Sequence, residues 1–496
     1  MLIYGERKVL DSVHKTEQLI IKLKRIAEKA IRKKKYNKAL SALSACANVL
    51  YEYNQRYKDD DIEDMLLKIG KSTILVPDDF KPKETHPVKT VLFYDGFGMD
   101  LRGLAANITK NIATLGYKLI YVTKGSAKGK QPYICKELQD FNVEFIYINM
   151  SSNYVNWALE LNSVFLKYSP QVAYFYTTPN DVSGAMVFNQ YNNRVTRILV
   201  NLTDHAFWVG LNAFDFCGAS RAMGAWINLK ERGIPLEKMY RSRSNIFISE
   251  KIPLGAMPFD ICKYRYVFSG GALYKTLGDT NNTFYKIIEH IIVTYSDVNY
   301  IYAGAGDDSE FKKLIAKYPD RVYLISERED FYQIIKGAVF YLNTYPMFGG
   351  QMMRYAAYAG KLPITLKHND DGQGILFHQE ELGIEFDTFE SVINEIDKIL
   401  TDDMYRKSKE DKLHMAVVSK EETLNNYRML IESQISPLPV SIEEFDTTQF
   451  RKQYIARLDF DQIQQKSIVK LGNLCLLPYF PRVFLRKVWQ HVKRIE

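Results

Sequence analysis

The chain has 496 residues, more than a single hydrophobic core usually serves, which predicts two principal domains with smaller appendages. Hydrophobic residues make up 46% and charged residues 25% of the composition, values typical of a folded globular protein rather than a disordered chain. The net charge of +8 favours anionic partners, but it is too modest to indicate nucleic acid by itself.

The five cysteines are widely spaced and odd in number, which excludes a disulfide framework and the usual zinc-ligand spacings. This pattern favours a reducing compartment. No apolar run approaches the roughly 20 residues that a membrane-spanning helix needs, and the first residues lack the apolar core of a signal peptide. The sequence therefore predicts a cytoplasmic protein.

Residues 1–87 are predicted to form a helical extension. Apolar side chains recur at helical spacing over residues 15–55, on both sides of a break at 35–37, which predicts a helical hairpin. The hairpin resembles a single tetratricopeptide-type helix pair, without the stacked repeats that a solenoid needs. A short helix is predicted over 59–69 and a polar linker over 78–87. The extension is interpreted as a scaffold or an acceptor-docking appendage.

Two successive regions alternate buried strands with helices. In the first, residues 88–255, a helix is predicted over 101–115 and strands over 88–94, 118–122, 143–148, 172–176 and 197–202. In the second, residues 256–435, a helix is predicted over 284–295 and strands over 266–269, 299–303, 322–325, 338–343 and 362–366. This α/β pattern predicts two Rossmann-like domains, whose ligands would bind at the carboxyl ends of the strands in a cleft between them.

A glycine turn at Phe348, Gly349 and Gly350 connects a buried strand directly to an Ala-rich helix. Such a turn exposes unpaired backbone N–H groups and the positive end of the helix dipole, which together can hold a phosphate. An ordinary strand-to-helix turn without a ligand explains the glycines equally well.

A second glycine turn follows the predicted strand over 266–269. Ser269, Gly270, Gly271 and Lys275 supply a hydroxyl, close backbone approach and a compact positive charge, all of which a diphosphate can use. The alternative is a loop with a solvated lysine.

Asp204 and His205 end a buried strand of the first domain. His205 could hydrogen-bond a sugar hydroxyl or a developing charge, while Asp204 could act as a base or fix the imidazole tautomer. The alternative for His205 is a cap on the following segment, and Trp208 could belong to the core.

A loop after the first strand carries Gly96, Phe97, Gly98 and Arg102, and we interpret it as an acceptor-binding loop. It does not complete a G-x-G-x-x-G fingerprint, and no acidic residue ends the second strand to bind a ribose, which disfavours a dehydrogenase.

The strand over 322–325 is followed by residues that could contact a nucleoside. Ile325 and Ser326 could bind a base, and Glu327 could contact a ribose or simply start a helix at Asp330. Motifs of zinc proteases, serine esterases and P-loop enzymes are absent from the sequence, and no metal site is predicted.

Together, these segments resemble bacterial Leloir glycosyltransferases of the GT-B architecture. The resemblance covers about residues 88–435 and is carried by the Asp-His-Ala-Phe-Trp segment at 204–208 and the Gly-Gly-x-Met-Met-x-Tyr-Ala-Ala-x-Ala-Gly-Lys segment at 349–361. It implies that the second domain binds a nucleotide-sugar donor, the first domain binds the acceptor, and neither a metal nor another cofactor takes part. Backbone amides, a helix dipole and a cation would then meet the phosphate charge.

The resemblance implies a role for each candidate residue. Ser269, Gly270, Gly271 and Lys275 would meet the diphosphate, and Lys275 would stabilise the departing nucleotide. The remaining donor-side residues would contact the base, ribose, phosphates or sugar: Ile325, Ser326, Glu327, Phe348, Gly349, Gly350 and Gln351.

In the first domain, His205 would lie beside the transferred sugar. One departure concerns the helix over 349–360, where many retaining relatives carry a glutamate and this chain has Arg354, Tyr355 and Ala356. Gln351 is the nearest polar substitute, so neither retention nor inversion is predicted.

Residues 436–496 are predicted to form a helical tail that returns toward the first domain. Over 471–494 the tail interleaves aliphatic and aromatic side chains with arginines and lysines, which favours binding to the surface of an anionic bilayer. An amphipathic helix packed on the first domain is the alternative.

The predicted function is transfer of a hexosyl or N-acetylhexosaminyl group from a nucleotide diphosphate sugar, which the resemblance implies is UDP-linked, to a lipid-linked saccharide. The site would be at the inner membrane face, in polysaccharide synthesis. Two alternatives remain open: a protein O- or N-glycosyltransferase, and a non-catalytic GT-B partner subunit that stabilises an active enzyme. A nucleic-acid partner is not expected.

Overall fold

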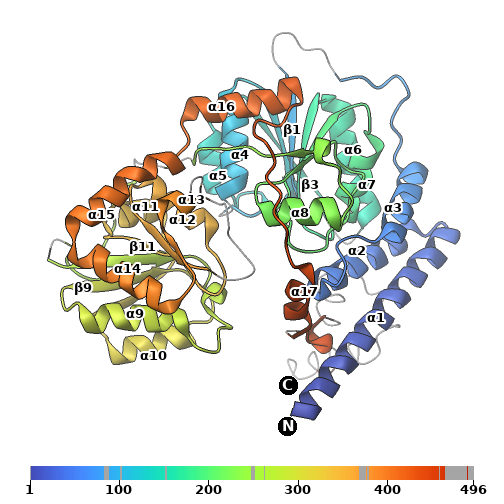
Figure 1. Cartoon of the computed structure of the whole chain (residues 1–496). Coiled ribbons are helices and arrows are strands. Elements are labelled where there is room, and N and C mark those ends of the chain that lie inside the picture. The colour runs from blue at the N-terminus through green and yellow to red at the C-terminus, as the bar shows by residue number, and fades with distance from the viewer. Residues whose placement is uncertain are drawn as a thin grey trace. The chain divides into compact units, whose positions relative to one another are not determined.

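The computed structural model describes residues 2–82, 89–100, 103–150, 153–246, 248, 252–261, 263–367, 376, 379–456, 458–463 and 489. The chain forms two compact units (Figure 1). Unit 1 comprises residues 1–242 and 424–496, and unit 2 comprises residues 243–423. No helix in the described part of the chain has the length and apolar character needed to cross a membrane.

Unit 1 is built on a seven-stranded parallel sheet in the order β3-β2-β1-β4-β5-β6-β7. Its strands are β1 Thr90–Asp95, β2 Lys118–Lys124, β3 Val143–Ile148, β4 Val172–Tyr176, β5 Thr196–Leu199, β6 Phe216–Gly218 and β7 Met239–Tyr240. Its connecting helices are α4 Gly103–Thr114, α5 Pro132–Leu138, α6 Tyr154–Tyr168, α7 Val182–Gln190 and α8 Ala222–Lys230, with short 3-10 turns at Gly125–Ala127 and Leu236–Lys238. The order is the doubly wound Rossmann order with one added edge strand.

Alternate residues of the central strands enter different cores, because successive side chains of a strand point to opposite faces. Leu92 and Tyr94 of β1 belong to one core, whereas Val91 and Phe93 pack with α4 and α5 on the other face. Continuous burial on both faces explains why these strands are uninterrupted apolar runs in the sequence.

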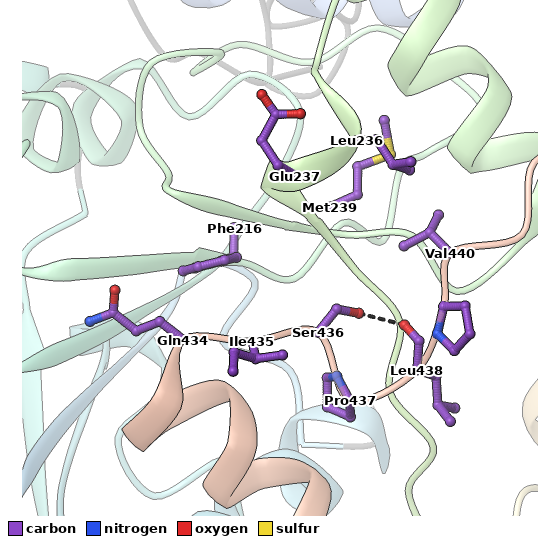
Figure 2. A pocket seen from close by; sticks show the side chains of 11 residues that line it. Phe216, Leu236, Glu237, Met239, Gln434, Ile435, Ser436, Pro437, Leu438 and Val440 are labelled. Carbon is purple, nitrogen blue, oxygen red and sulfur yellow. Dashed lines mark hydrogen bonds between the residues drawn. The ribbon is translucent and has the colours of Figure 1, made fainter.

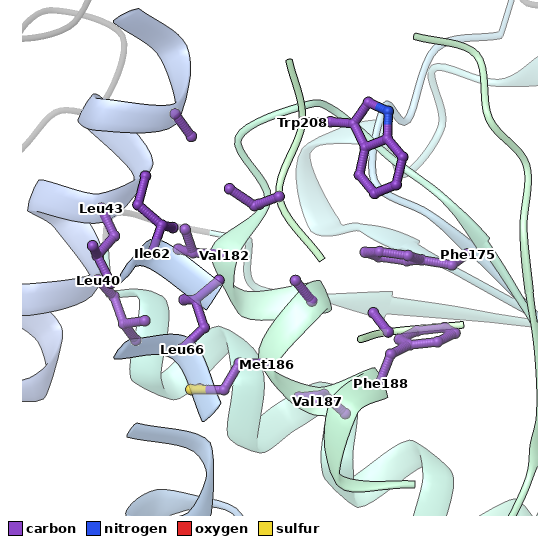
Figure 3. Close-up of a cluster of buried hydrophobic side chains, with 14 of the residues drawn as sticks. Leu40, Leu43, Ile62, Leu66, Phe175, Val182, Met186, Val187, Phe188 and Trp208 are labelled. Carbon is purple, nitrogen blue, oxygen red and sulfur yellow. The ribbon is translucent and has the colours of Figure 1, made fainter. Parts of the chain in front are cut away.

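Three N-terminal helices form an additional layer of unit 1: α1 Leu2–Arg32, α2 Tyr36–Tyr53 and α3 Asp60–Thr73. Their apolar residues join the same core as α6 and α7, as Figure 3 shows for Leu40, Leu43, Ile62 and Leu66 beside Val182 and Met186. The helical N-terminus predicted from the sequence is confirmed. The shared core makes these helices part of unit 1 rather than an appendage.

The chain returns to unit 1 after unit 2. Helix α16 (Lys420–Arg428), a π-helical turn at Met429–Ser433 and α17 (Thr447–Ala456) form this return. Leu430 and Ile431 enter the core beside α4, and the Arg451 guanidinium donates a 2.5 Å hydrogen bond to Glu231. The basic segment predicted over 471–494 lies outside the described residues, apart from residue 489.

Unit 2 has a six-stranded parallel sheet in the order β10-β9-β8-β11-β12-β13, again the Rossmann order. Its strands are β8 Arg265–Gly270, β9 Val298–Ala303, β10 Val322–Ile325, β11 Tyr341–Leu342, β12 Pro363–Leu366 and β13 Glu385–Phe386. Its helices are α9 Thr283–Thr294, α10 Ser309–Lys317, α11 Phe331–Gly337, α12 Gly350–Tyr358, α13 Gln379–Leu382, α14 Phe389–Thr401 and α15 Asp403–Glu410, with 3-10 turns at Leu273–Thr276 and Asp411–Ala416. The predicted α/β class with two Rossmann-like domains is confirmed.

Candidate functional site

The strand order of unit 2 reverses direction between β8 and β11, which pair at Phe268 and Tyr341. Ligands of doubly wound sheets bind outside the carboxyl ends of strands at such a switch point. Gly270 ends β8 and Gly271 begins the turn that follows, and the segment after β11 leads to Gly349 and Gly350. Both glycine turns predicted from the sequence therefore flank the switch point of one sheet.

Glycine residues, which have no side chains, lie around the carboxyl end of β8. Gly271 has a φ of +131°, and a Cβ built there would have no atom within 4 Å, so the space beside it is open. The neighbouring Gly304 follows β9, and a Cβ at that position would lie 2.0 Å from the Gly271 carbonyl oxygen. Side chains larger than glycine are therefore excluded at Gly304, and a ligand can approach the backbone of Gly271 closely.

Gly304 and Gly306 were not singled out in the sequence. The Ala-Gly-Ala-Gly run directly after the predicted strand over 299–303 is the signal that could have identified them. Gly306 has a φ of +138°, in the region that favours glycine, and a Cβ there would lie 3.1 Å from the Leu273 Cβ.

Lys275 links the two glycine turns. Its Nζ donates a 3.3 Å hydrogen bond to the Phe348 carbonyl oxygen, and its own carbonyl oxygen accepts one of 3.0 Å from the Met347 N–H. The Asn343 Oδ1 accepts a 3.1 Å hydrogen bond from the Gly349 N–H, which fixes the turn immediately before α12. A positive charge and a helix N-terminus thus lie together beside the open backbone of Gly271.

The first turn of α12 offers backbone donors, because the N–H groups that start a helix have no partner within it. The Gln351 Nε2 is buried and has no hydrogen-bond partner among the described residues. Arg354, in the region of α12 where the sequence resemblance led us to expect a glutamate, directs its guanidinium to the Ser244 carbonyl oxygen. The side chain of Arg354 is therefore engaged with the start of unit 2.

The Ser269 hydroxyl does not point where the sequence-based interpretation placed it. Its side chain is fully buried, its Oγ donates a 2.5 Å hydrogen bond to the Leu342 carbonyl oxygen, and it accepts one of 2.6 Å from the Tyr300 hydroxyl. Because Ser269 is the penultimate residue of β8, its side chain points into the sheet's packing layer. The hydroxyl is used within the fold and is not directed toward a diphosphate.

The predicted base-binding residues lie two strands from the switch point. Ile325 ends β10, and its carbonyl oxygen accepts a 3.0 Å hydrogen bond from the Gly304 N–H, so it adjoins the glycine-lined end of β9. Ser326 and Glu327 are exposed, and a helix does start where the sequence suggested, because Asp330 is the N-cap of α11.

In unit 1, Asp204 and His205 lie in the loop after β5. The Asp204 side chain is 7% exposed and forms an ion pair with Arg221, whose Nε donates a 2.9 Å hydrogen bond. Burial alone would raise the pKa of Asp204, but the charge of Arg221 and hydrogen bonds from His205 and Arg221 outweigh burial and hold that pKa well below its usual value. Asp204 is consequently a poor proton acceptor at neutral pH.

His205 keeps one third of its side chain exposed, and its Nδ1 lies 3.5 Å from Asp204 Oδ1. This distance suits an interaction that orients the ring. Trp208 is buried, with the Arg232 guanidinium 4.8 Å from its ring centroid.

The His205 loop is held by side chains from the N-terminal helices. Asn54, the residue after α2, donates a 3.0 Å hydrogen bond to the His205 carbonyl oxygen and accepts one of 3.1 Å from the Phe207 N–H. Both carboxylate oxygens of Glu63 accept backbone hydrogen bonds, from Gly210 at 2.8 Å and Leu211 at 3.1 Å. Sequence reasoning missed these contacts.

Arg232 completes this support from the other side of the loop. Its guanidinium donates to the Asp204 carbonyl oxygen at 2.9 Å and the Ala206 carbonyl oxygen at 2.6 Å. Side chains far apart in the sequence therefore fix the backbone on both sides of His205.

The predicted acceptor loop begins with an internal turn. The buried Asp95 carboxylate accepts hydrogen bonds from the N–H groups of Phe97, at 3.0 Å, and Gly98, at 2.9 Å. A Cβ at Gly96 would lie 2.1 Å from the Thr177 Oγ1, so only glycine fits there. Arg102 lies outside the described residues.

A cavity of about 440 Å³ lies elsewhere in unit 1, between the β6–β7 edge and residues 434–440 (Figure 2). Phe216, Met239 and Leu438 contribute apolar surface, and Glu237 is its ionisable residue. None of the residues predicted from the sequence lines this cavity.

No protein-family model matches the chain, and no curated protein matches its sequence. Solved structures do match. A mutant O-GlcNAc transferase of Thermobaculum terrenum gives a TM-score of 0.52 at 12% identity, covering 89% of this chain and 82% of that chain. A glycosyltransferase of Rickettsia africae gives 0.52 at 12% identity, covering 70% of this chain and 99% of that chain.

A UDP-N-acetylglucosamine 2-epimerase gives a TM-score of 0.50 at 13% identity, covering 72% of this chain and 99% of that chain. At such low identities these likenesses show the fold. The chain has the GT-B fold, as the sequence resemblance implied.

Proposed function

We propose that this protein is a glycosyltransferase that uses a nucleotide diphosphate sugar, UDP-linked, as its donor. The observation that carries this proposal is the grouping of Lys275, the open backbone of Gly271 and the N-terminus of α12 at the switch point of unit 2. A lysine, exposed backbone and helix donors are the groups that a diphosphate requires. The names of the matching solved structures, two transferases and a UDP-sugar epimerase, agree with this choice of donor.

In the proposed reaction, an acceptor hydroxyl oxygen forms a bond to the anomeric carbon of the donor sugar. The bond between that carbon and the diphosphate oxygen breaks, the nucleotide diphosphate leaves with the electron pair, and the proton of the acceptor hydroxyl is released to water. Lys275 and the first N–H groups of α12 stabilise the negative charge on the leaving group without a metal ion. The acceptor is a lipid-linked saccharide, and the product serves polysaccharide assembly at the membrane.

We assign His205 to the sugar or acceptor side of this reaction. Its partly exposed ring is held by a rigid backbone and by Asp204. Because Asp204 is tied to Arg221 with a lowered pKa, we assign it the positioning of His205 rather than the role of base.

Release of free sugar from a panel of purified UDP-, GDP- and CDP-sugars, measured in the presence of EDTA, tests the proposal. We expect activity with a UDP-sugar, and a loss of about a hundredfold or more for Lys275→Ala, the size typical of removing a charge-stabilising donor. Gly350→Pro removes one donor at the first helical position, which tolerates proline, and is expected to reduce activity while α12 remains folded.

Lys336→Ala, in the last turn of α11, is the matched control and should retain wild-type turnover. Turnover that survives both Lys275→Ala and Gly350→Pro would exclude the proposed donor site. Activity that requires added metal would exclude the metal-independent mechanism.

A non-catalytic partner subunit is the second candidate, and Arg354 is the observation that favours it. Its guanidinium is engaged with Ser244, in the region of α12 where the sequence resemblance implies a glutamate in retaining enzymes and none is present. If no nucleotide sugar is hydrolysed or raises the thermal unfolding temperature, this candidate replaces the first.

A further inference from the structure

A groove of about 580 Å³ runs along the N-terminal helices α1 and α2, away from the candidate residues of unit 1. It is lined by six cationic side chains: Lys22, Arg25, Lys29, Lys33, Lys35 and Lys38. No acidic residue is among the described residues that line it. We call this surface the basic groove.

The charge imbalance of the chain lies in the segment that contains the basic groove. Residues 21–38 contain nine lysines and arginines and one glutamate, a net charge of +8, which equals the net charge of all 496 residues. The rest of the chain is therefore balanced, and the positive charge is gathered on one helical hairpin.

The groove cations near the end of α1 form a continuous line. Lys22, Arg25 and Lys29 are three or four residues apart, which places them on one face of the helix over a length of about 10 Å, and Lys33 follows in the turn directly after α1. Lys24 faces the other way, where its Nζ donates a 2.9 Å hydrogen bond to Asp59 of the neighbouring α3 N-terminus. The cation that the fold directs inward is thus paired with an acidic side chain, whereas the residues that line the groove include no Asp or Glu.

Exposed aliphatic side chains accompany the charges. Ile21 is 42% exposed at the groove, and Leu10 is 67% exposed further along α1. They are eleven residues apart, close to three helical turns, so Leu10 lies on the same side of α1 as Ile21, along the edge of the line of groove cations. Cations flanking exposed aliphatic residues on one helical face are typical of helices that lie on an anionic membrane surface.

We propose that the basic groove binds the surface of an anionic lipid bilayer. An acidic protein segment could neutralise the cations, but it would not account for Leu10, which lies outside the groove on the same side of α1 as Ile21. A bilayer accounts for both the cations and the exposed aliphatic side chains. Its anionic headgroups pair with the lysines, and its interface accepts the aliphatic side chains. Binding of this kind does not depend on sugar transfer and is measured without a donor.

Sedimentation of the full chain with vesicles tests this proposal. Vesicles of phosphatidylcholine alone are compared with vesicles that contain about one third phosphatidylglycerol. We expect binding to the anionic vesicles alone, and a loss of most of that binding when the salt concentration is raised to about 0.5 M.

The decisive variant reverses three charges of the groove, Lys22→Glu, Arg25→Glu and Lys29→Glu. Each cation near an anionic surface contributes several-fold to affinity, so the triple change is expected to weaken binding by about a hundredfold. A matched control reverses Lys312, Lys313 and Lys317 of α10, which are 72%, 71% and 60% exposed and alter net charge equally. The control is expected to retain most of the binding.

Equal losses in both triple variants would overturn the proposal, because net charge rather than the groove would then govern binding. Wild-type binding that the groove variant retains would also overturn it, by locating the membrane contact elsewhere. Binding of polyglutamate without binding of anionic vesicles would assign the groove to an acidic protein. Circular dichroism and thermal unfolding confirm that each variant is folded.

Discussion

At the scale of single residues, the backbone around His205 depends on Asn54. This side chain is fully buried, and its amide group makes hydrogen bonds to the backbone on either side of Ala206. Asn54 also has a φ of 44°, in the left-handed region that asparagine and glycine tolerate better than other residues. One residue therefore ends α2 and fixes the loop that presents His205.

Asn54→Gly tests this role, because glycine keeps the left-handed conformation while losing both side-chain hydrogen bonds. We expect the free energy of unfolding to fall by about 2–4 kcal/mol, since a buried carbonyl and a buried N–H lose their partners. The fractional fall in turnover should exceed the fractional change in the Michaelis constant for the donor, because the donor is assigned to unit 2. Chemical denaturation and steady-state kinetics measure the two effects.

Asn193→Gly is the matched control, since Asn193 has a φ of 58° but is exposed. It is expected to leave stability and turnover unchanged. Asn54→Asp retains the acceptor for the Phe207 N–H and should be intermediate. If Asn54→Gly retains full stability and turnover, the loop does not need this support.

Residue identity alone could not have revealed these contacts. Asn54 and His205 are 151 positions apart, and Glu63 and Gly210 are 147 apart, so no local pattern connects them. Ser269 illustrates the opposite error. A hydroxyl at a strand end was predicted to face the ligand, but the alternation of side chains along β8 directs it into the core instead.

At the scale of elements, the sequence predicted the longer strands best. The strands predicted over 143–148, 172–176 and 322–325 coincide with β3, β4 and β10. β4 is a central strand buried along its whole length and is a continuous apolar run, whereas β3 and β10 are edge strands that were found because apolar residues stand between turns. The short strands β6 and β7 were missed, since two or three residues are too few to show a pattern. The glycine turns were found because strand, turn and helix follow one another directly.

Helix α3 contributes a buried carboxyl group whose ionisation should be visible in stability. Burial raises the pKa of Glu63 to about 7 from the ordinary value of 4.5, although hydrogen bonds from Gly210 and Leu211 oppose the rise. The folded protein therefore binds this proton more tightly than the unfolded chain. The resulting stability is complete below the unfolded pKa and is lost as the pH rises through about 7.

Glu63→Gln tests this linkage, because glutamine has nearly the same shape and does not titrate. The wild type is expected to lose about 3 kcal/mol more stability than the variant between pH 4.5 and pH 8. Other buried carboxyl groups, such as Asp95, titrate in both proteins and cancel in the comparison. Urea denaturation at each pH measures the difference, and parallel curves for the two proteins would show that Glu63 does not titrate in this range.

At the scale of the whole molecule, the question is whether the N-terminal helices can be deleted to test acceptor binding without unfolding unit 1. They were interpreted from the sequence as a scaffold or a docking appendage, and an appendage could be removed without harming the rest. Instead, Leu40, Leu43, Ile62 and Leu66 are fully buried in the core that contains α7. The apolar surface that they cover belongs to the unit that presents His205.

Removal of residues 1–82 is therefore expected to unfold unit 1 rather than to yield an enzyme lacking only its acceptor preference. Each of the four buried side chains contributes about 1.5–3 kcal/mol, and their sum is comparable to the whole stability of a typical domain. Unit 2 has its own hydrophobic core, so the truncated chain should show one cooperative transition together with increased binding of a hydrophobic dye. Calorimetry of the full and truncated chains, with the dye measurement alongside, distinguishes these outcomes. A truncated protein with the full chain's thermal profile and no added dye binding would mean that the helices are an appendage after all, and the support of His205 by Asn54 and Glu63 would then be dispensable.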